Sequence, residues 1–241
     1  MSKIDPTARV EDGAVIGDDV TIGPFCIVGP HVTIGAGTKL LSHVNITART
    51  TIGENCTISP FVSLGTPPQS LGWRGELTDL VIGNGCTFRE GATVSAGTVA
   101  GGGITRIGDR GYFMNNAHVG HDCIVGNDVI FATSATLGGH CEIGDFVFIG
   151  GLSAAHQFVR IGAQVMVGGV SGVRGDVVPF AMVNGQRARL EGLNLVGMKR
   201  RGFNRERIRT LQAFYTELFH GAGTFAERLV ELRQMRGAEA P

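Results

Sequence analysis

The chain has 241 residues, of which 43% are hydrophobic, so it can bury one large core or a core and a smaller appendage, and general disorder is excluded. Basic and acidic residues number 21 each, so a formal net charge of zero provides no global field to attract nucleic acid. The N-terminus has no apolar signal-peptide core, and no run of about 18 uncharged apolar residues occurs, so we expect a cytoplasmic protein without a membrane span.

A repeat with a period of six begins near the N-terminus. Aliphatic residues recur at every sixth position: Ile16, Ile22, Val28, Ile34, Leu40, Ile46, Ile52, Ile58 and Leu64. Glycine follows most of them, at Gly17, Gly23, Gly29, Gly35, Gly53 and Gly65. This period is typical of hexapeptide parallel β-helices, in which each repeat supplies one short strand and one turn. We expect the aliphatic side chain to point inward and the glycine to adopt backbone angles that other residues avoid.

Two interruptions divide the repeat. The first is GTPPQSLGWRGELTD (65–79), after which the same phase resumes at Ile82, Phe88 and Val94. The second is the glycine-rich AGTVAGGGITR (96–106), which shifts the phase by one residue. Insertions in such solenoids project from a face. Trp73 and Arg74 in the first favour a binding loop over passive decoration, whereas the glycines at 101–103 lack the spacing of a nucleotide-binding loop.

After the second interruption the repeat runs without a break: Ile107, Phe113, Val119, Val125, Phe131, Leu137, Ile143, Ile149, Ala155, Ile161, Val167 and Val173. The whole pattern resembles that of the left-handed β-helix acyltransferases, in which three hexapeptides form one triangular coil. The resemblance implies the left hand, since the general rule for parallel crossovers predicts the right hand. We therefore expect a mainly β protein, a left-handed parallel β-helix with a small C-terminal α-helical domain.

The five cysteines all lie four positions after a repeat aliphatic residue: Cys26, Cys56, Cys86, Cys123 and Cys141. Other repeats carry valine or alanine at this position, so the cysteines are interpreted as small core fillers. Cys123 and Cys141 should stack on neighbouring coils, where a cytosolic chain would keep them reduced. No pair has CxxC spacing, which argues against a catalytic thiol.

The segment NAHVGHDC (116–123) holds two histidines three residues apart, followed by an aspartate. With three hexapeptides in each coil, Gly139 should neighbour His121, and His140 should neighbour Asp122. We expect no third metal ligand to stack on the histidine pair, so a metal site is not predicted. Asp122 can hold one ring nitrogen of His121 while the other faces a substrate, and a glycine N–H nearby can meet an oxyanion. These parts together indicate acyl transfer through a general base.

The hexads stop near residue 186, which predicts a β-helix domain over 1–185 and a helical domain over 186–241. One helix is expected between Asn204 as its N-cap and Gly221, and a second is expected to open with a capping box formed by Thr224 and Glu227. Eight basic residues, here called the basic segment, lie in this region: Arg187, Arg189, Lys199, Arg200, Arg201, Arg205, Arg207 and Arg209. A solvated face is the plain interpretation, but clustered guanidinium groups suit phosphates or an acidic protein.

Three segments resemble those of the acyl-[acyl-carrier-protein]–UDP-N-acetylglucosamine O-acyltransferases of lipid A synthesis: NAHVGHDCIVGN, GGLSAAHQFVRIGAQVMVGGVSGV and GMKRRGF. The match runs along essentially the whole chain. It implies a cytoplasmic homotrimer with active sites between adjacent subunits. It also implies transfer of a 3-hydroxyacyl group from acyl carrier protein to the 3-position of UDP-N-acetylglucosamine, without metal or redox cofactor.

The resemblance also implies the roles of individual residues. His121 matches the catalytic base, Asp122 the residue that orients it, and Gly139 the amide of the oxyanion hole. Gly169 matches the position that limits acyl length. The remaining matches are to substrate-binding positions: Gln69, Ser70, His118, His140, His156, Gln157, Asn194, Arg200 and Arg201.

The chain departs from the family pattern at several positions. Ser70 and Gly72 replace an aspartate and a lysine, Ser95 replaces a histidine, Val196 replaces a glutamate, and the tail is shorter. These changes leave the base in place but alter the expected sugar and nucleotide contacts. An acceptor with a 3-amino group, giving an amide product, is therefore an alternative. Two other interpretations are a hexapeptide acetyltransferase that uses acetyl-CoA and a rod-like scaffold without activity.

Overall fold

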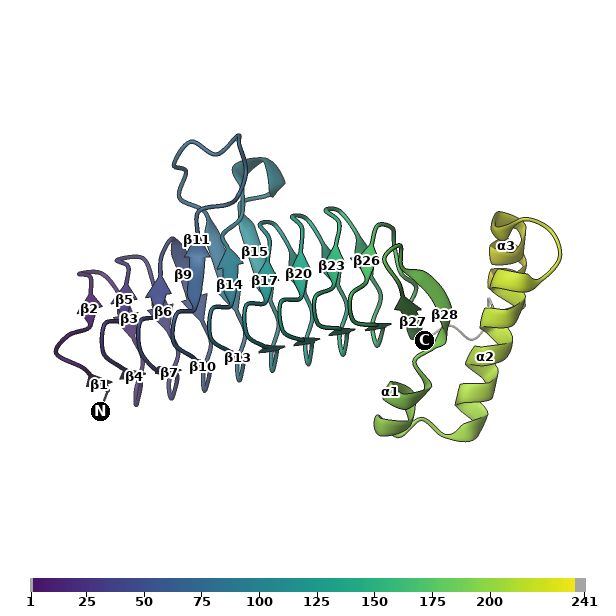
Figure 1. Cartoon of the computed structure of the whole chain (residues 1–241), viewed down its shortest axis with the longest axis horizontal. Coiled ribbons are helices and arrows are strands. Elements are labelled where there is room, and N and C mark those ends of the chain that lie inside the picture. Colours follow the sequence, from purple (N-terminus) through teal and green to yellow (C-terminus); the bar gives the residue numbers. More distant parts are fainter. Residues whose placement is uncertain (1, 237–241) are drawn as a thin grey trace. The chain divides into compact units, whose positions relative to one another are not determined.

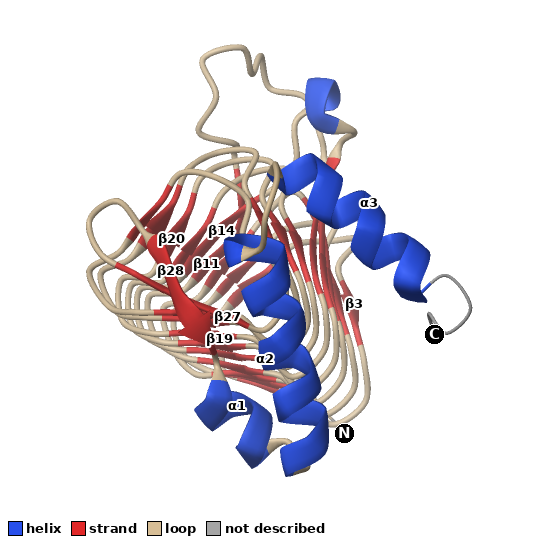
Figure 2. Ribbon diagram, turned by 90° about the vertical axis from the view of Figure 1, so that its right-hand side faces the viewer, coloured by secondary structure: helices blue, strands red, loops and turns tan. Residues whose placement is uncertain are grey.

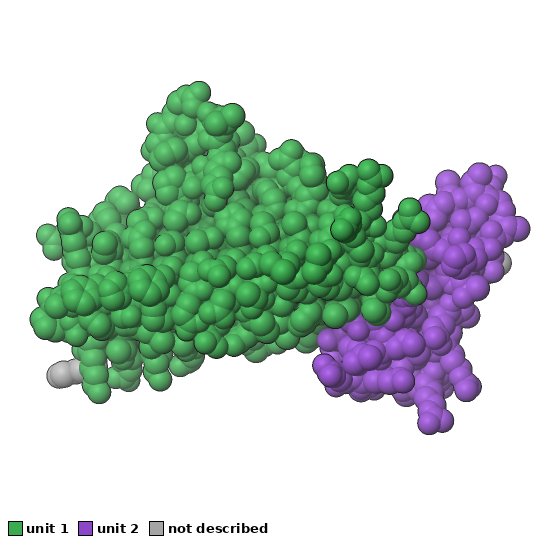
Figure 3. Space-filling model, in the orientation of Figure 1, with its two compact units in different colours: residues 1–191 green, residues 192–241 purple. Residues whose placement is uncertain are grey.

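The computed structural model describes residues 2–236. Residue 1 of the first expected domain and residues 237–241 of the second lie outside the described residues. The chain divides into two compact units, residues 1–191 and 192–241, of which residues 2–191 and 192–236 are described (Figure 3). This division lies a few residues beyond the change of composition near residue 186.

The first unit is a left-handed parallel β-helix, so the expected fold class is confirmed (Figure 1). Its strands form three sheets in the described residues, and Figure 2 shows them stacked around a common axis. The first sheet contains β1 (Lys3–Ile4), β4 (Thr21–Ile22), β7 (Lys39–Leu40), β10 (Thr57–Ile58), β13 (Thr87–Phe88), β16 (Tyr112–Phe113), β19 (Ile130–Phe131), β22 (Phe148–Ile149), β25 (Met166–Val167), β27 (Ala181–Asn184) and β28 (Arg189–Leu193).

The second sheet contains β2 (Arg9–Val10), β5 (Ile27–Val28), β8 (Asn45–Ile46), β11 (Ser63–Thr66), β14 (Thr93–Ser95), β17 (His118–Val119), β20 (Thr136–Leu137), β23 (Ala154–Ala155) and β26 (Gly172–Val173). The third contains β3 (Val15–Ile16), β6 (Thr33–Ile34), β9 (Arg49–Ile52), β12 (Asp79–Ile82), β15 (Ile104–Ile107), β18 (Ile124–Val125), β21 (Glu142–Ile143) and β24 (Arg160–Ile161). From β1 to β27, consecutive strands along the chain belong to different sheets, so each full coil contributes one strand to each wall; β28 then joins the same sheet as β27.

The inward position of the repeat forms the core, as expected. From Ile22 to Val173 every repeat residue is at most 4% exposed. The five cysteines are also buried and free, which confirms them as core fillers. Phe88, Phe113 and Phe131 stack in successive coils, with ring centroids 4.6 and 4.9 Å apart. This continuous apolar interior stabilises strands that are mostly only two residues long.

The role expected for the repeat glycines holds only at Gly65, whose φ angle is 70°, and was wrong for the other five. Gly17, Gly23, Gly29, Gly35 and Gly53 do not have positive φ angles. They are small because the next coil lies directly against them: a Cβ atom on Gly23 would lie 1.5 Å from the carbonyl oxygen of Leu41, and one on Gly35 would lie 2.7 Å from that of Gly53.

Left-handed backbone occurs instead at the corners, three positions after the inward residue. In the second run of repeats it falls on every sixth residue: Arg110, Asn116, Asp122, Asp128, Ser134, His140, Phe146, Leu152, Phe158, Gln164 and Val170. Branched and aromatic residues rarely adopt this conformation, so the stacking of coils must impose it. Corner side chains of successive coils consequently lie one above another, which decides how the candidate site is built.

The two interruptions are insertions: the pairing of strands between successive coils continues across each of them. Thr57 pairs with Lys39 of the preceding coil across a regular step, whereas its partner in the following coil is Thr87, beyond the first insertion. Thr87 in turn pairs with Tyr112, beyond the second insertion. Both insertions project from the same part of the first unit, above β11, β14 and β15 (Figure 1). Their bases are joined by hydrogen bonds from Ala96 N–H to the Thr66 carbonyl and from Asp79 N–H to the Gly103 carbonyl.

The second unit is helical. It contains α1 (Leu195–Arg200), α2 (Arg205–His220) and α3 (Phe225–Arg236). The Asn204 side chain caps α2, and Thr224 and Glu227 form the reciprocal hydrogen bonds of a capping box, so both predicted helices are confirmed. The short helix α1, capped by Asn194, was not predicted from the sequence. No helix within residues 2–236 has the length and apolar character needed to cross a bilayer.

Candidate active site

The site is built at the corner that follows β17. His118 lies in that strand, Val119 points into the core, and the chain turns at His121 and Asp122. Asp122 has a φ angle of 60°, a conformation in which aspartate is less strained than most residues. Its N–H donates to Oγ1 of Thr105 at 2.8 Å, which ties the corner to the preceding coil. The turn brings two consecutive side chains, the imidazole and the carboxylate, into contact.

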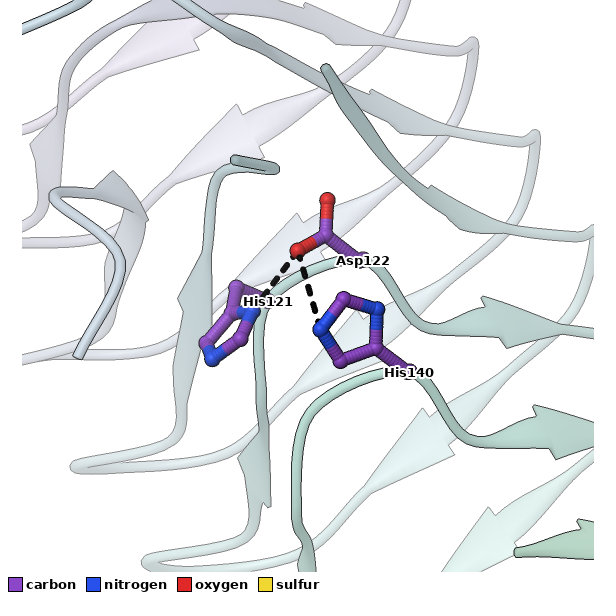
Figure 4. Close-up of side chains that lie close together, drawn as sticks. All are labelled: His121, Asp122 and His140. Carbon is purple, nitrogen blue, oxygen red and sulfur yellow. Dashed lines mark hydrogen bonds and ion pairs between the residues drawn. The ribbon is translucent and has the colours of Figure 1, made fainter. Parts of the chain in front are cut away.

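His121 and Asp122 form a hydrogen-bonded pair (Figure 4). Nδ1 of His121 lies 2.7 Å from Oδ2 of Asp122, whose side chain is 1% exposed. Asp122 also accepts two hydrogen bonds from Thr98. A carboxylate surrounded by donors favours the His121 tautomer with its proton on Nδ1. In that tautomer, the lone pair of Nε2 is available to take a proton from a substrate.

His140 arrives from the next coil at the corresponding corner. Its N–H donates to the carbonyl oxygen of His121 at 2.9 Å, and its Nε2 lies 3.7 Å from Oδ2 of Asp122 (Figure 4). The His140 ring meets that of His121 edge-on and stacks on Phe158 one coil further, with centroids 4.4 Å apart. The neighbourhood of His140 and Asp122 expected from the stacking of coils is therefore present in the structure.

Gly139 lies directly beside the imidazole of His121, also as the stacking predicts. A Cβ atom at this position would lie 2.6 Å from Cε1 and 2.8 Å from Nε2 of that ring. The carbonyl oxygen of Gly139 accepts a hydrogen bond from Phe158 N–H, whereas its own N–H donates to no other group among the described residues. This N–H is therefore available to donate to an oxygen of a substrate.

His118 forms no hydrogen bond with His121 within residues 2–236 and lies outside the cluster of donor atoms formed by His121, Asp122 and His140. Its Nδ1 lies 2.8 Å from Oγ1 of Thr93 in the preceding coil. Burial, together with the nearby charge of His121, lowers the pKa of His118 below its ordinary value. His118 is thus a neutral neighbour of the pair over most of the physiological pH range.

The expectation that no third metal ligand lies near was wrong. Donor atoms of His121, Asp122 and His140 all lie within 4.8 Å of one another. The stacking argument had already placed His140 beside Asp122, and the error was not to count these two residues as ligands together with His121. However, Asp122 already accepts two hydrogen bonds from Thr98, and Nδ1 of His121 is bound to Asp122. A cation would have to displace these hydrogen bonds, so the arrangement suits proton transfer better than metal binding.

The other candidate residues of the β-helix lie on neighbouring coils. His156 and Gln157 are exposed on the coil after His140, and Nδ1 of His156 lies 3.2 Å from the carbonyl oxygen of Gln157. Gly169 lies one coil further, and a Cβ atom there would meet only backbone atoms of Gly151, the nearest at 3.4 Å. The structure therefore leaves room for a larger residue at position 169.

The first insertion carries Gln69, which is exposed, and Ser70, which is half-buried. No hydrogen bond within residues 2–236 joins either one to His121 or Asp122. Beneath the insertion is an apolar cavity of about 240 Å³, lined in part by Pro67, Pro68 and Trp73. Ser95 is fully buried, and its hydroxyl has no hydrogen-bond partner among the described residues.

Three candidate residues belong to the helical unit. Oδ1 of Asn194 accepts a hydrogen bond from Gly197 N–H and so caps α1, a structural use that the sequence did not reveal. Arg200 ends α1 and is exposed, and Arg201 follows it. Burial lowers the pKa of Arg201 from its ordinary value.

Sequence reasoning missed the threonines that support the histidines. Thr93, Thr98 and Thr105 come from the preceding coil or from the second insertion, and each bonds to one of the residues His118 and Asp122. The second insertion was an available signal, because it lengthens the coil that begins at Thr93, and Thr93 pairs with His118 of the next coil.

Comparison with known proteins supports one family. The profile described as "Udp N-acetylglucosamine O-acyltransferase; Domain 2" matches residues 176–240, and that of the bacterial transferase hexapeptide matches residues 13–48. The acyl-[acyl-carrier-protein]–UDP-N-acetylglucosamine O-acyltransferase of Azorhizobium caulinodans is 58% identical over 99% of this chain and 88% of its own length. That of Rhizobium johnstonii is 48% identical over 97% and 86%. The UDP-N-acetylglucosamine acyltransferase structure from Campylobacter jejuni superposes with a TM-score of 0.93 at 38% identity, covering 98% of this chain and 92% of that one.

Proposed function

The chain belongs to the family of acyl-[acyl-carrier-protein]–UDP-N-acetylglucosamine O-acyltransferases, and from this premise we propose how its residues carry out the reaction. The enzyme transfers an acyl group from acyl carrier protein to UDP-N-acetylglucosamine in lipid A biosynthesis. The finer assignment is that the group is a 3-hydroxyacyl chain, that the acceptor is the 3-hydroxyl of the sugar, and that His121 is the general base.

The reaction begins with removal of a proton. Nε2 of His121 takes the proton of the acceptor hydroxyl while its oxygen attacks the thioester carbon, and the charge moves to the carbonyl oxygen. The 2.7 Å hydrogen bond from Nδ1 to Asp122 carries the proposal, because it fixes the ring and stabilises the imidazolium that forms. No other group of the site, within the described residues, offers an imidazole so oriented.

The second half of the reaction breaks the carbon–sulfur bond. The free N–H of Gly139 donates to the oxyanion of the tetrahedral intermediate. This intermediate then collapses: the carbonyl group re-forms, giving the ester, and the thiolate leaves. The imidazolium of His121 returns its proton to the leaving sulfur. All atoms and charges balance without a metal or a redox cofactor.

We also propose that the active enzyme is a cytoplasmic homotrimer, with Gln69, Ser70, His156, Gln157, Asn194, Arg200 and Arg201 contacting substrate at sites between subunits. One observation that supports association is a stack of exposed rings along one edge of the β-helix: Phe25, His43 and Phe61, with centroids 5.0 Å apart in each step. Phe25 and Phe61 are 57% and 63% exposed. Exposed aromatic clusters of this kind are typically covered in protein–protein interfaces.

An assay with defined donors and acceptors tests the function. Purified enzyme should form ester from 3-hydroxyacyl carrier protein and UDP-N-acetylglucosamine, and acetyl-CoA should give no product. Product from acetyl-CoA alone would instead support the acetyltransferase, and binding without turnover of any donor would support the scaffold. Mass measurement in solution should give three subunits, and a monomer would contradict the trimer.

The same assay decides the acceptor. Ser70 and Gly72 lack the charges that the family pattern has in this insertion, which is the observation favouring a changed sugar contact. Ser95, in contrast, is fully buried and offers no surface that a sugar could contact in this conformation. The 3-hydroxyl and 3-amino acceptors should therefore be compared at equal concentration. Amide formation equal to or faster than ester formation would assign the amino sugar, because hydroxyl and amine are distinguished by few polar contacts.

A further inference from the structure

The glycine-rich insertion between β14 and β15 contacts the carboxylate of Asp122. Thr98, in this insertion, contacts that carboxylate with two donors. Its backbone N–H donates to Oδ1 and its hydroxyl donates to Oδ2, both at 2.7 Å. Both oxygens of Asp122 are therefore held by one residue that lies in the preceding coil's insertion, far from it in the sequence.

The direction of the hydroxyl hydrogen bond is fixed by a third group. Oγ1 of Thr98 accepts a hydrogen bond from Gly101 N–H at 3.0 Å, as the cap of the 3₁₀ helix η1 (Val99–Gly101). Its proton is therefore directed to Asp122. The chain of donors runs from Gly101 through Thr98 to Oδ2, which also accepts from Nδ1 of His121. With the side chain 1% exposed, water has little access to replace a missing donor.

The glycines of the insertion are explained by this contact. A Cβ atom on Gly101 would lie 2.2 Å from the carboxyl carbon of Asp122, so no side chain fits there. Gly102 and Gly103 have φ angles of 100° and 81°, which turn the chain back towards β15. The hydroxyl of Thr78 donates to the Gly97 carbonyl at 2.6 Å and fixes the base of the insertion. The segment is thus shaped to bring Thr98 against Asp122.

The contact matters because Asp122 has two possible imidazole partners. Oδ2 lies 2.7 Å from Nδ1 of His121 and 3.7 Å from Nε2 of His140. A modest rotation of the carboxyl group would exchange one histidine for the other. Hydrogen bonds to both oxygens oppose this rotation, since each would be lost without replacement in the buried site.

We propose that Thr98 is a positioning residue: it locks the Asp122 carboxylate onto Nδ1 of His121, so that Nε2 stays aimed at the substrate. This inference rests on the proposed function, in which His121 is the base. It also gives the second insertion a role, that of completing the catalytic pair from outside the regular coils.

Replacement of the hydroxyl tests the proposal. Thr98→Val keeps the shape and the backbone N–H but removes the donor to Oδ2, and we expect turnover to fall about 10 to 100-fold with the KM values for both substrates unchanged. Thr98→Ser restores the hydroxyl and should recover most of the loss. Thr38→Val is the matched control, because Thr38 is a buried threonine whose hydroxyl donates to Gly53 and accepts from Cys56 N–H, remote from the site. If Thr98→Val does not fold, Thr98→Ala makes the same comparison.

A double-mutant cycle separates positioning from a general structural role. In the Asp122→Asn background, Thr98→Val should cause little further loss, because the group through which Thr98 acts has already been altered. Losses that multiply would overturn the inference, as would full turnover of Thr98→Val in an active enzyme. An inactive wild-type enzyme would overturn the proposed function, and this inference would fall with it.

Discussion

Gly139 lies against the imidazole of His121 so closely that a Cβ atom at position 139 would come within 2.6 Å of Cε1 of the ring. Glycine is needed here because the ring of His121 lies against it, and it has no special φ angle. We predict that Gly139→Ala lowers turnover by at least about tenfold, because the methyl group displaces the ring while the backbone N–H remains. Steady-state kinetics and a thermal unfolding curve measure the two effects separately.

The thermal midpoint of Gly139→Ala should change little, since the methyl group meets a side chain that can move. Unchanged turnover in this variant would show that the ring of His121 does not need its observed position. A large loss of stability would instead indicate that backbone packing between coils is affected.

Removal of the imidazole of His121, the proposed base, gives the second prediction. His121→Ala should lower turnover by about 100 to 10,000-fold with little change in nucleotide binding, which calorimetry measures. Asp122→Asn should cost less, because it weakens orientation and leaves the base. Asparagine tolerates the left-handed φ of 60° at this corner, so Asp122→Asn isolates the loss of charge from backbone strain. Near-normal turnover of folded His121→Ala would remove this residue from the mechanism.

The sequence predicted the coils well because a six-residue period directly reports the inward position. The aliphatic residues from Ile22 to Val173 are buried as expected, and the stacking of three hexapeptides per coil placed Gly139 and His140 correctly. Sequence failed at five of the six repeat glycines, all but Gly65, since close approach of the next coil and left-handed backbone both favour glycine, and only coordinates distinguish the two causes.

The supporting contacts of the site were beyond the sequence for a different reason. Thr98 lies in an insertion whose path does not follow the repeat, so no stacking rule places it beside Asp122. The helix α1 was missed because six residues are too few to show a helical period. The assignments that came from resemblance, such as those of Gln69 and Arg200, remain predictions.

Acyl length gives the third prediction. Gly169 has no positive φ angle, and the space at its Cβ is open except for backbone of Gly151 at 3.4 Å. We expect Gly169→Met to fold normally and to shift preference towards shorter 3-hydroxyacyl donors, with little loss of turnover on the best of them. Gly175→Met, where a Cβ meets nothing within 4 Å, is the control. A chain-length profile equal to that of the wild type would place the end of the acyl groove elsewhere.

The basic segment gives the fourth prediction. Arg187, Arg189, Arg205 and Arg207 are exposed, and acyl carrier proteins are acidic, so the KM for the carrier-bound donor should rise as salt is added. Charge reversal by Arg205→Glu should raise this KM at low salt. A small 3-hydroxyacyl pantetheine donor, which lacks the acidic protein, should show no such dependence. If the KM for the carrier-bound donor does not change up to several hundred millimolar salt, these arginines do not bind the carrier and serve only to keep the surface solvated.

The last prediction concerns pH and stability at His118. Burial lowers the pKa of this imidazole below 6.5, its ordinary value, so the folded protein resists a proton that the unfolded chain accepts. As the pH falls through about 6.5, the unfolded state takes up this proton first and the free energy of unfolding decreases, by at most about 1.4 kcal/mol per pH unit, until the folded-state pKa is reached. His118→Gln removes the titrating group and should flatten the curve of unfolding free energy against pH just below 6.5. An equal slope in wild type and variant would contradict this account, because His118 would then titrate alike in both states.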